Sequence, residues 1–166
     1  DDTWAAVEAA AAGEVEGLAP RIRGAIGEFA ALVRRLRRRI GVLPLPMRNI
    51  ALTAMEIATI ERLFPGRLIP GFGHGVQDWM GQIGARVASP LTLMTEALPT
   101  LRALLNGETV TIDGRYVQLD EVALDWPPAS APPLLAAGEG PKTLALAGQL
   151  ADGTVMSKDD GPRAGT

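Results

Sequence analysis

Three short segments of the sequence combine glycine or proline with polar side chains, a composition that suits loops at a ligand site. The first is 43–49 and ends in Arg48 and Asn49, the second is 71–79 and holds His74, and the third is 137–143 and holds Lys142. Each segment follows or closes a short apolar run typical of a strand. In parallel α/β folds the loops at the carboxyl ends of the strands carry the chemistry. We therefore expect the three loops to lie at one edge of a sheet.

His74 is the one histidine of the chain and lies between Gly73 and Gly75. Glycines let the backbone approach a ligand closely, and the nearby Gln77 and Trp79 could form a polar and aromatic wall against a planar ring. The pattern indicates His74 as the one imidazole available for acid–base work. A structural or merely exposed histidine is the alternative.

The third loop has the composition of an anion-binding helix start. Gly138 and Gly140 precede Pro141, Lys142 and Thr143. Proline suits the first helical turn, whose free N–H groups attract a phosphate or another anion. The order and spacing of a P-loop are absent. The alternative is a plain connection, and for Arg48 it is a solvent-facing side chain in a stiff turn.

Composition excludes several classes of chemistry. The 166 residues carry a formal charge of −3 and include no cysteine and one histidine. No disulfide framework, thiolate zinc site, iron–sulfur cluster, cysteine nucleophile or two-histidine metal motif is therefore possible, and we expect no metal. The acidic balance disfavours nucleic acid as a partner, and no apolar run is long enough to span a membrane. A cytoplasmic location is expected.

Apolar periodicity and turn residues predict the elements that must position these loops. Strands are expected at 40–43, 67–73, 134–137 and 153–156, and helices at 50–63, 92–105 (with a kink at Pro99) and 141–150. The β-rich segment 109–119 predicts a hairpin around an Asp113–Gly114 turn. Two further helices are expected at 4–12 and 26–39, and the tail 158–166 reads as disordered. The strand–helix alternation favours an α/β fold with a parallel sheet.

The sequence resembles the bacterial luciferase-like family of flavin- or deazaflavin-dependent oxidoreductases, which are built on a TIM (β/α)8 barrel. The matching stretches are Gly-Val-Leu-Pro-Leu-Pro-Met-Arg-Asn from Gly41, Glu-Ile-Ala-Thr-Ile from Glu56, Pro-Gly-Arg-Leu-Ile-Pro-Gly-Phe-Gly-His-Gly from Pro65, Leu-Arg-Ala-Leu-Leu-Asn-Gly-Glu-Thr-Val from Leu101, Asp-Gly-Arg-Tyr from Asp113, Gly-Pro-Lys-Thr-Leu-Ala-Leu-Ala-Gly from Gly140 and Ala-Asp-Gly-Thr-Val from Ala151. Their order and spacing carry the resemblance.

The resemblance implies a cofactor, coenzyme F420 or FMN, lying across the mouth of the barrel and supporting hydride transfer or monooxygenation on a small organic substrate. It implies a bulged or cis peptide near Gly41–Val42 and a phosphate beside the Gly-Pro-Lys turn. The residues so implied for cofactor binding are Gly41, Val42, Gly73, His74, Gly75, Gln77, Gly138, Gly140, Pro141, Lys142 and Thr143. His74 is the expected catalytic residue, and Arg48 and Trp79 the expected substrate contacts.

The resemblance covers only the third to sixth strands of the family's barrel. About 115 residues match, whereas a whole barrel needs about 250. We expect a partial barrel at 40–157 with a hairpin insertion, a helical segment of uncertain kinship at 1–39, and a truncated or divergent oxidoreductase. The alternative is a non-catalytic half-barrel that binds or assembles and closes its open edges as a homodimer.

Overall fold

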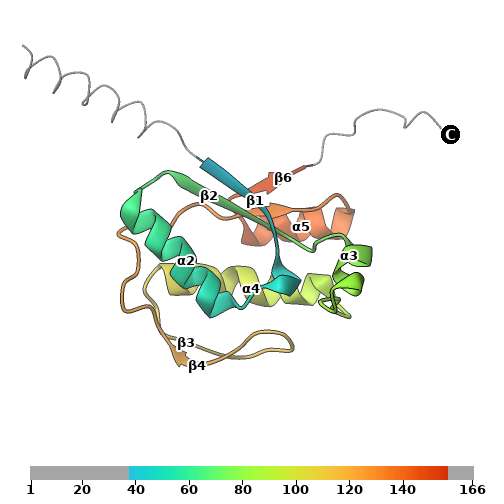
Figure 1. The fold of residues 1–166 in the computed structure, drawn as a ribbon, viewed down its shortest axis with the longest axis horizontal. Helices are drawn as coiled ribbons and strands as arrows, with labels where there is room; N and C mark the ends of the chain where they lie inside the picture. Colours follow the sequence, from blue (N-terminus) through green and yellow to red (C-terminus); the bar gives the residue numbers. More distant parts are fainter. Residues whose placement is uncertain (1–37, 157–166) are drawn as a thin grey trace, which may run out of the picture. The chain divides into compact units, whose positions relative to one another are not determined.

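A four-stranded parallel sheet organises the part of the chain that the structure, a computed structural model, describes: residues 38–156. The strands are β1 (Arg38–Pro44), β2 (Leu68–Gly73), β5 (Leu135–Ala137) and β6 (Gly153–Val155). They lie in the order β1-β2-β5-β6, and every neighbouring pair is parallel (Figure 1). The predicted parallel α/β arrangement is confirmed.

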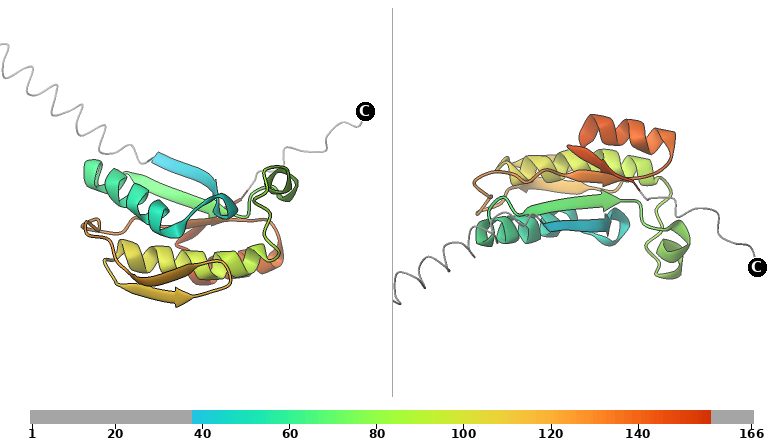
Figure 2. Two further views of the ribbon diagram at one scale, coloured as in Figure 1. Left: turned by 60° about the horizontal axis from the view of Figure 1, so that its bottom comes forward. Right: turned by 90° about the horizontal axis from the view of Figure 1, so that it is seen from above.

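The helices that connect these strands lie together on one face of the sheet (Figure 2). They are α2 (Ile50–Leu63), α4 (Pro90–Leu105) and α5 (Pro141–Leu150), with a 3-10 turn, η1 (Leu45–Met47), and a short helix, α3 (Gln77–Gln82), at the carboxyl ends of β1 and β2. Parallel strands with their crossover helices on one face form an arc of a βα barrel. Within residues 38–156, no helix is long and apolar enough to cross a membrane.

Local sequence explains where α2 begins and ends. The side chain of Asn49 accepts a hydrogen bond from the Leu52 N–H at 3.1 Å, which caps the first turn. At the other end, buried Glu61 accepts bonds from the N–H groups of Gly66 (2.8 Å) and Leu68 (3.0 Å). This carboxylate satisfies the turn into β2 and so fixes the start of that strand against the helix.

Helix α4 is the centre of the core. Ser89 caps this helix. The inner face of α4 is buried against α2, α5 and the hairpin. Its core residues are Leu93, Met94, Ala97, Leu98, Leu101, Leu104 and Leu105. The helix continues through Pro99, which lies on its exposed side. Burial of this apolar stripe is what stabilises the layer of helices under the sheet.

The hairpin packs outside α4, and its turn differs from the prediction. Strands β3 (Val110–Asp113) and β4 (Gln118–Val122) are antiparallel, as expected, but the loop is the four-residue segment 114–117 rather than a tight turn at Asp113–Gly114. Asp113 instead pairs with Gln118 in the ladder. The reason is Glu96 of α4, whose carboxylate accepts the loop N–H groups of Arg115 (2.9 Å), Tyr116 (2.8 Å) and Val117 (3.0 Å).

Two other expectations are corrected. Arg38 and Arg39 belong to β1 and not to a helix, because they pair with Leu68 and Ile69 of β2. The segment after His74, expected to be a loop, contains α3. The predicted helix at 4–12, most of the one at 26–39 and the tail at 158–166 lie outside the described residues.

Replacing Glu96 with glutamine is expected to lower the free energy of unfolding at neutral pH by about 1 kcal/mol, because a neutral amide oxygen is a weaker acceptor for the three N–H groups. Burial acts to raise the pKa of Glu96, but the hydrogen bonds from Tyr116, Arg115 and Val117 and the charge of Arg115 together lower it. The wild-type contribution is therefore present above the ordinary glutamate pKa and is lost as the pH falls through the lowered one.

Urea unfolding at neutral pH and near pH 3 measures this effect, and the difference between wild type and E96Q should shrink in acid. The matched change at exposed Glu108, E108Q, serves as the control. An equal loss in both variants would contradict the role given to Glu96.

Candidate functional site

The register of the parallel strands brings the three predicted loops to one edge. Pro44 at the end of β1 lies level with Gly73 at the end of β2, and Phe72 of β2 lies level with Ala136 of β5. The loops that follow β1, β2 and β5 therefore leave the sheet side by side. This confirms that the segments rich in glycine and proline share one edge of the sheet.

A hydrogen bond joins the second loop to the third. His74 Nε2 lies 3.2 Å from Thr143 Oγ1, although the two residues are 69 positions apart. Thr143 is buried in the first turn of α5, and its methyl group packs over Gly138, where a Cβ would overlap Thr143 Cγ2. The glycine of this loop thus makes room for the threonine that reaches His74.

The environment of His74 favours a neutral ring. Burial lowers the pKa of His74, and the backbone carbonyl of Pro90, which acts in the opposite direction, only partly offsets this. Nδ1 is buried and has no hydrogen-bond partner among the described residues. A neutral imidazole at this edge can donate one hydrogen bond and accept one.

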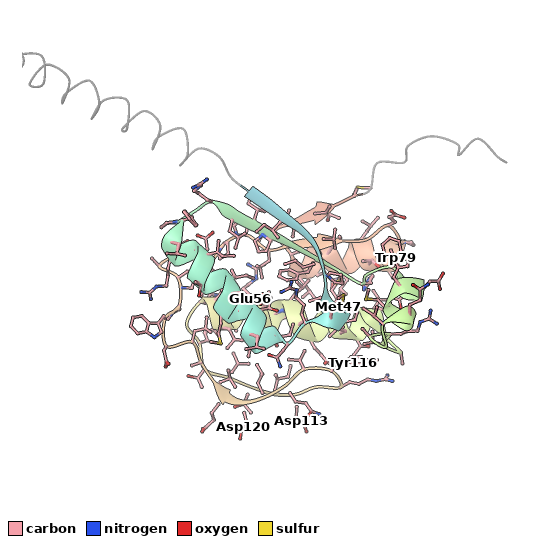
Figure 3. All side chains as sticks on the ribbon, viewed as in Figure 1. Met47, Glu56, Trp79, Asp113, Tyr116 and Asp120 are labelled. Atoms are coloured by element: carbon pink, nitrogen blue, oxygen red, sulfur yellow. The ribbon has the colours of Figure 1, made fainter. Side chains whose placement is uncertain are left out.

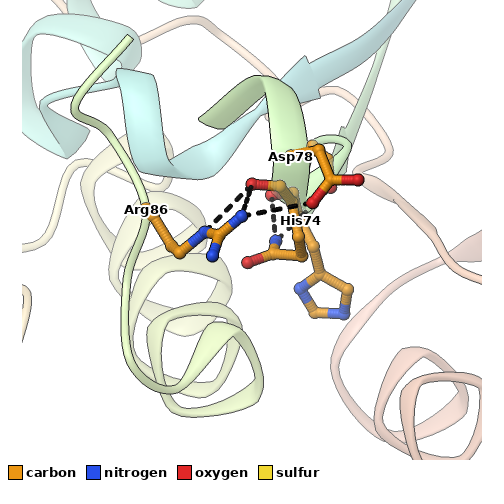
Figure 4. Close-up of polar contacts among 5 residues, drawn as sticks. His74, Asp78 and Arg86 are labelled. Atoms are coloured by element: carbon orange, nitrogen blue, oxygen red, sulfur yellow. Dashed lines mark hydrogen bonds and ion pairs between the residues drawn. The ribbon is translucent and has the colours of Figure 1, made fainter. Parts of the chain in front are cut away.

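The loop that carries His74 is braced by side chains of α3 and the segment after it (Figure 4). The Gln77 amide donates to the carbonyl of His74 at 3.2 Å, and the Arg86 guanidinium donates to the carbonyl of Gln77 at 3.1 and 2.9 Å. Arg86 also pairs with Asp78 at 3.3 Å. Gly75 has a φ of 68°, and a Cβ at this position would lie 2.8 Å from Met80 Sδ, so that the loop needs glycine here. Gln77 therefore supports the loop backbone.

Strand β1 has an irregular and partly exposed segment beside this loop. The β1–β2 register shifts between Ile40 and Leu43, and the peptide bond Gly41–Val42 is cis, as the resemblance implied. A Cβ at Gly41 would lie 3.1 Å from the carbonyl oxygen of Gly71, which explains the glycine. The side chain of Val42 is 44% exposed, so it is available to contact a ligand.

The first turn of α5 has no side-chain cap and is exposed at Gly140. Gly140 is the N-cap of the helix and provides no side-chain cap, and no atom would touch a Cβ placed on it. Pro141 and Lys142 are exposed. The first-turn N–H groups and the Lys142 ammonium group together suit an anion.

Arg48 and Trp79 occupy the same end of the sheet but are not part of the His74–Thr143 contact. The Arg48 guanidinium pairs with Glu56 of α2 at 2.7 Å. Trp79 lies on α3 and is 62% exposed; Figure 3 shows it at the end of the molecule formed by α3. Arg48 is therefore tied to α2, whereas Trp79 is free to contact a ligand beside the His74 loop.

Arg86 could not be identified from the sequence, because no motif marks its bond to Gln77, nine residues away.

Among residues 38–156 no group of three or more histidine, aspartate or glutamate side chains could hold a metal ion. A hollow of about 390 Å³ does lie elsewhere, between α2 and the segment Val122–Trp126, but none of the predicted site residues lines it.

The fold and the position of the site define an α/β barrel unit with its ligand loops at the carboxyl ends of the strands. Residues 25–165 match the family described as luciferase-like monooxygenase. The chain belongs to this family, and the described residues form part of its TIM barrel.

Similar proteins include 5,10-methylenetetrahydromethanopterin reductase of Methanolobus tindarius, 34% identical over 110 residues that cover 66% of this chain and 33% of the relative. Phthiodiolone/phenolphthiodiolone dimycocerosates ketoreductase of Mycobacterium kansasii is 36% identical over 126 residues, 74% of this chain and 34% of the relative. The chain therefore spans about a third of the length of the curated relatives it matches.

Solved structures agree on the fold. The coenzyme F420-dependent tetrahydromethanopterin reductase of Methanopyrus kandleri superposes with a TM-score of 0.66 at 23% identity, over 72% of this chain and 39% of that one. An F420-dependent secondary alcohol dehydrogenase in complex with an F420-acetone adduct gives a TM-score of 0.63 at 27% identity, over 77% of this chain and 41% of that one.

The two glycines of the third loop are expected to respond differently to alanine. G138A should lower the free energy of unfolding by about 1–3 kcal/mol, because the new methyl group overlaps Thr143. G140A, whose Cβ would face open space, should change it by less than about 1 kcal/mol, because the lower entropy of the unfolded chain offsets the poorer N-cap that alanine provides. Chemical denaturation of the two variants measures the difference, and equal stabilities would contradict the packing described here.

Proposed function

We propose that the chain is the cofactor-binding part of an oxidoreductase that uses coenzyme F420 or FMN to exchange a hydride with a small organic substrate. The observation that carries the proposal is the convergence of Val42, His74 and the α5 start at one edge of the sheet, closed by the 3.2 Å His74–Thr143 contact. A cytoplasmic location, expected from the sequence, is part of the same proposal.

The residues present fit such a cofactor. The exposed Gly41 and Val42 of β1 offer an apolar surface for a ring, and the uncapped start of α5 with Lys142 offers an anion site for a phosphate. His74 joins the second loop to the α5 start through the contact of its Nε2 with Thr143. A planar ring with a phosphate-bearing tail would fit the two regions.

The bound cofactor would supply hydride chemistry, which amino-acid side chains cannot perform alone. The protein's part is then placement and electrostatics. Val42 would contact the ring, the α5 start and Lys142 would hold the phosphate, and neutral His74 would fix the second loop against the α5 start through its contact with Thr143 without adding charge. Trp79 would limit the access of water and contact substrate.

The names of the relatives favour a deazaflavin over a flavin. Both solved structures described above are named as F420-dependent, while the family as a whole is described as luciferase-like monooxygenase. The substrates of the relatives differ from one another, a methanopterin derivative in one and a phthiodiolone lipid in another. We therefore propose a small organic substrate and no narrower class.

Titration of the chain with coenzyme F420 and with FMN, followed by cofactor fluorescence, tests the proposal. One of the two should bind with a dissociation constant in the high micromolar range or tighter. The charge reversal K142E should weaken this binding about fivefold or more, because it removes the cation at the α5 start. The matched reversal R115E, in the exposed hairpin loop, should not. No binding of either cofactor would overturn the proposal for this chain.

A second candidate function is assembly, because the described part of the sheet ends in two strands, β1 and β6, that each have one neighbour. Exposed apolar side chains lie on β1, on η1 and along α2 to its C-cap: Ile40, Val42, Met47, Leu52, Met55, Leu63 and Phe64. A homodimer that covers this surface would remove the open edge.

Size-exclusion chromatography with light scattering tests this second candidate. A dimer is expected if the surface beside β1 is an interface between copies, and the substitution M55K, at an exposed position of α2, should then shift it to monomer. The substitution I83K, at an exposed position after α3, is the matched control. A wild-type monomer at all accessible concentrations would argue against dimeric closure.

A further inference from the structure

We propose that Arg86 is a positioning residue for the His74 loop: its guanidinium binds the backbone of α3 at Gln77 and so sets the Gln77 side chain against the His74 carbonyl. The positioning concerns this chain's own residues and holds without a cofactor. Its consequence for a ligand rests on the function proposed above, in which the His74 loop is part of the cofactor site.

Helix α3 depends on contacts from outside itself. It has six residues, far fewer than the roughly 12–15 that an isolated helix needs to be stable in water. Its N-cap residue, Val76, makes no side-chain hydrogen bond, and Met80 is its one buried residue. The first turn of α3, which follows the His74 loop directly, therefore needs a further partner.

Arg86 is such a partner. Its Nε and Nη2 atoms donate to the carbonyl oxygen of Gln77 at 3.1 and 2.9 Å, and Nη2 also lies 3.3 Å from Asp78 Oδ1 (Figure 4). Hydrogen bonds from a charged donor are stronger than those between neutral groups. The ion pair adds little, because the side chains of Arg86 and Asp78 are 55% and 90% exposed. The two bonds to the Gln77 carbonyl are the main contact.

Gln77 transmits this constraint to the site. Its carbonyl accepts the bonds from Arg86, and its side-chain amide donates to the carbonyl oxygen of His74 at 3.2 Å. If the first turn of α3 opened, the Gln77 amide would lose its place and the His74 carbonyl its donor. The order of the His74 loop therefore depends on a residue that does not touch it.

The backbone of Arg86 is itself held in place, as a positioning residue requires. Arg86 lies in the connection 83–89 between α3 and α4. The side chain of Val87 packs against the core, and the N–H of Ser89 donates to the hydroxyl of Tyr116 in the hairpin at 2.8 Å. The hairpin thus helps to fix the segment from which Arg86 reaches α3.

Gly81 makes room for the guanidinium on α3. A Cβ at Gly81 would lie 2.9 Å from Arg86 Nη2 and 3.1 Å from Cζ and Nε. Glycine inside a helix otherwise costs about 1 kcal/mol relative to alanine. Helix α3 therefore contains a poor helix former at the position where the guanidinium lies.

Hydrogen exchange of the full chain without cofactor tests the contact with α3. The amide of Met80, which donates to the Val76 carbonyl at 2.9 Å, reports the opening of this helix. R86Q should lower the protection of this amide about fivefold or more, the effect of one net hydrogen bond. The matched change R62Q, at an exposed arginine that stacks on Trp126 at 4.8 Å, should leave it unchanged.

The single histidine makes the loop itself observable, because the chain gives one imidazole Hε1 resonance. In R86Q this resonance should move toward its position in the urea-unfolded chain, whereas in R62Q it should not. Unchanged shifts of Leu101, in the core of α4, verify that each variant is folded. A His74 resonance that keeps its wild-type position in R86Q overturns the proposal even if Met80 loses protection, because Arg86 would then stabilise α3 without positioning the loop.

Two further variants separate the bonds to Gln77 from charge and from helix propensity. R86K keeps the charge beside Asp78 but lacks the planar fork of donors, and should resemble R86Q. An R86K chain that matches wild type overturns the proposal, since the role would belong to the charge. G81A should raise Met80 protection about threefold or more in the R86Q chain, but less in wild type, where the methyl group displaces the guanidinium. Equal gains would also overturn it.

The titration with cofactor separates this inference from the proposed function. If R86Q frees the loop as expected but neither coenzyme F420 nor FMN binds the wild type, the positioning stands and the cofactor assignment fails. If a cofactor binds the wild type while R86Q leaves the His74 resonance unchanged, the assignment stands and the role given to Arg86 fails.

Discussion

The parallel register of four strands is the constraint on which the site depends. Because Pro44, Gly73 and the residues of β5 end at one level, loops that lie far apart in the sequence leave the sheet together. His74 and Thr143 can then bond across 69 positions. The crossover helices α2, α4 and α5 cover one face of the sheet, so they do not block the edge formed by the carboxyl ends of the strands.

Two acidic residues maintain this arrangement by binding backbone N–H groups. Glu61 closes the turn that starts β2, and Glu96 holds the hairpin loop against α4. Each satisfies donors that would otherwise lack partners. Glu61 and Glu96 therefore act in stabilising the fold.

Much of the fold could be predicted from the sequence because its signals are local. Asn49 and the pair Pro65–Gly66 delimit α2, and Pro141 starts α5 at the predicted residue. The features that failed depend on distant partners. Arg38 and Arg39 are strand residues because β2 pairs with them, and the hairpin turn is set by Glu96, whose bond to Arg115 spans 19 positions. Helix α3 has only six residues and no side-chain cap.

For the candidate site, too, some features could be predicted from the sequence and others could not. Its location could be predicted, because loops after parallel strands converge whatever their sequence. The roles within it could not: Gly138 and Gly140 look alike in the sequence, but one packs under Thr143 and the other is open. Gln77 likewise reads as a ligand contact and in the structure supports the His74 backbone. Only the packing distinguishes a residue that meets a ligand from one that positions its neighbour.

The most direct test of the account is a crystal structure of the chain grown or soaked with the cofactor that it binds more tightly. The account predicts density for the ring and phosphate between Val42, His74 and Gly140. Density in the hollow between α2 and Trp126 instead, or none at saturating cofactor, would contradict it.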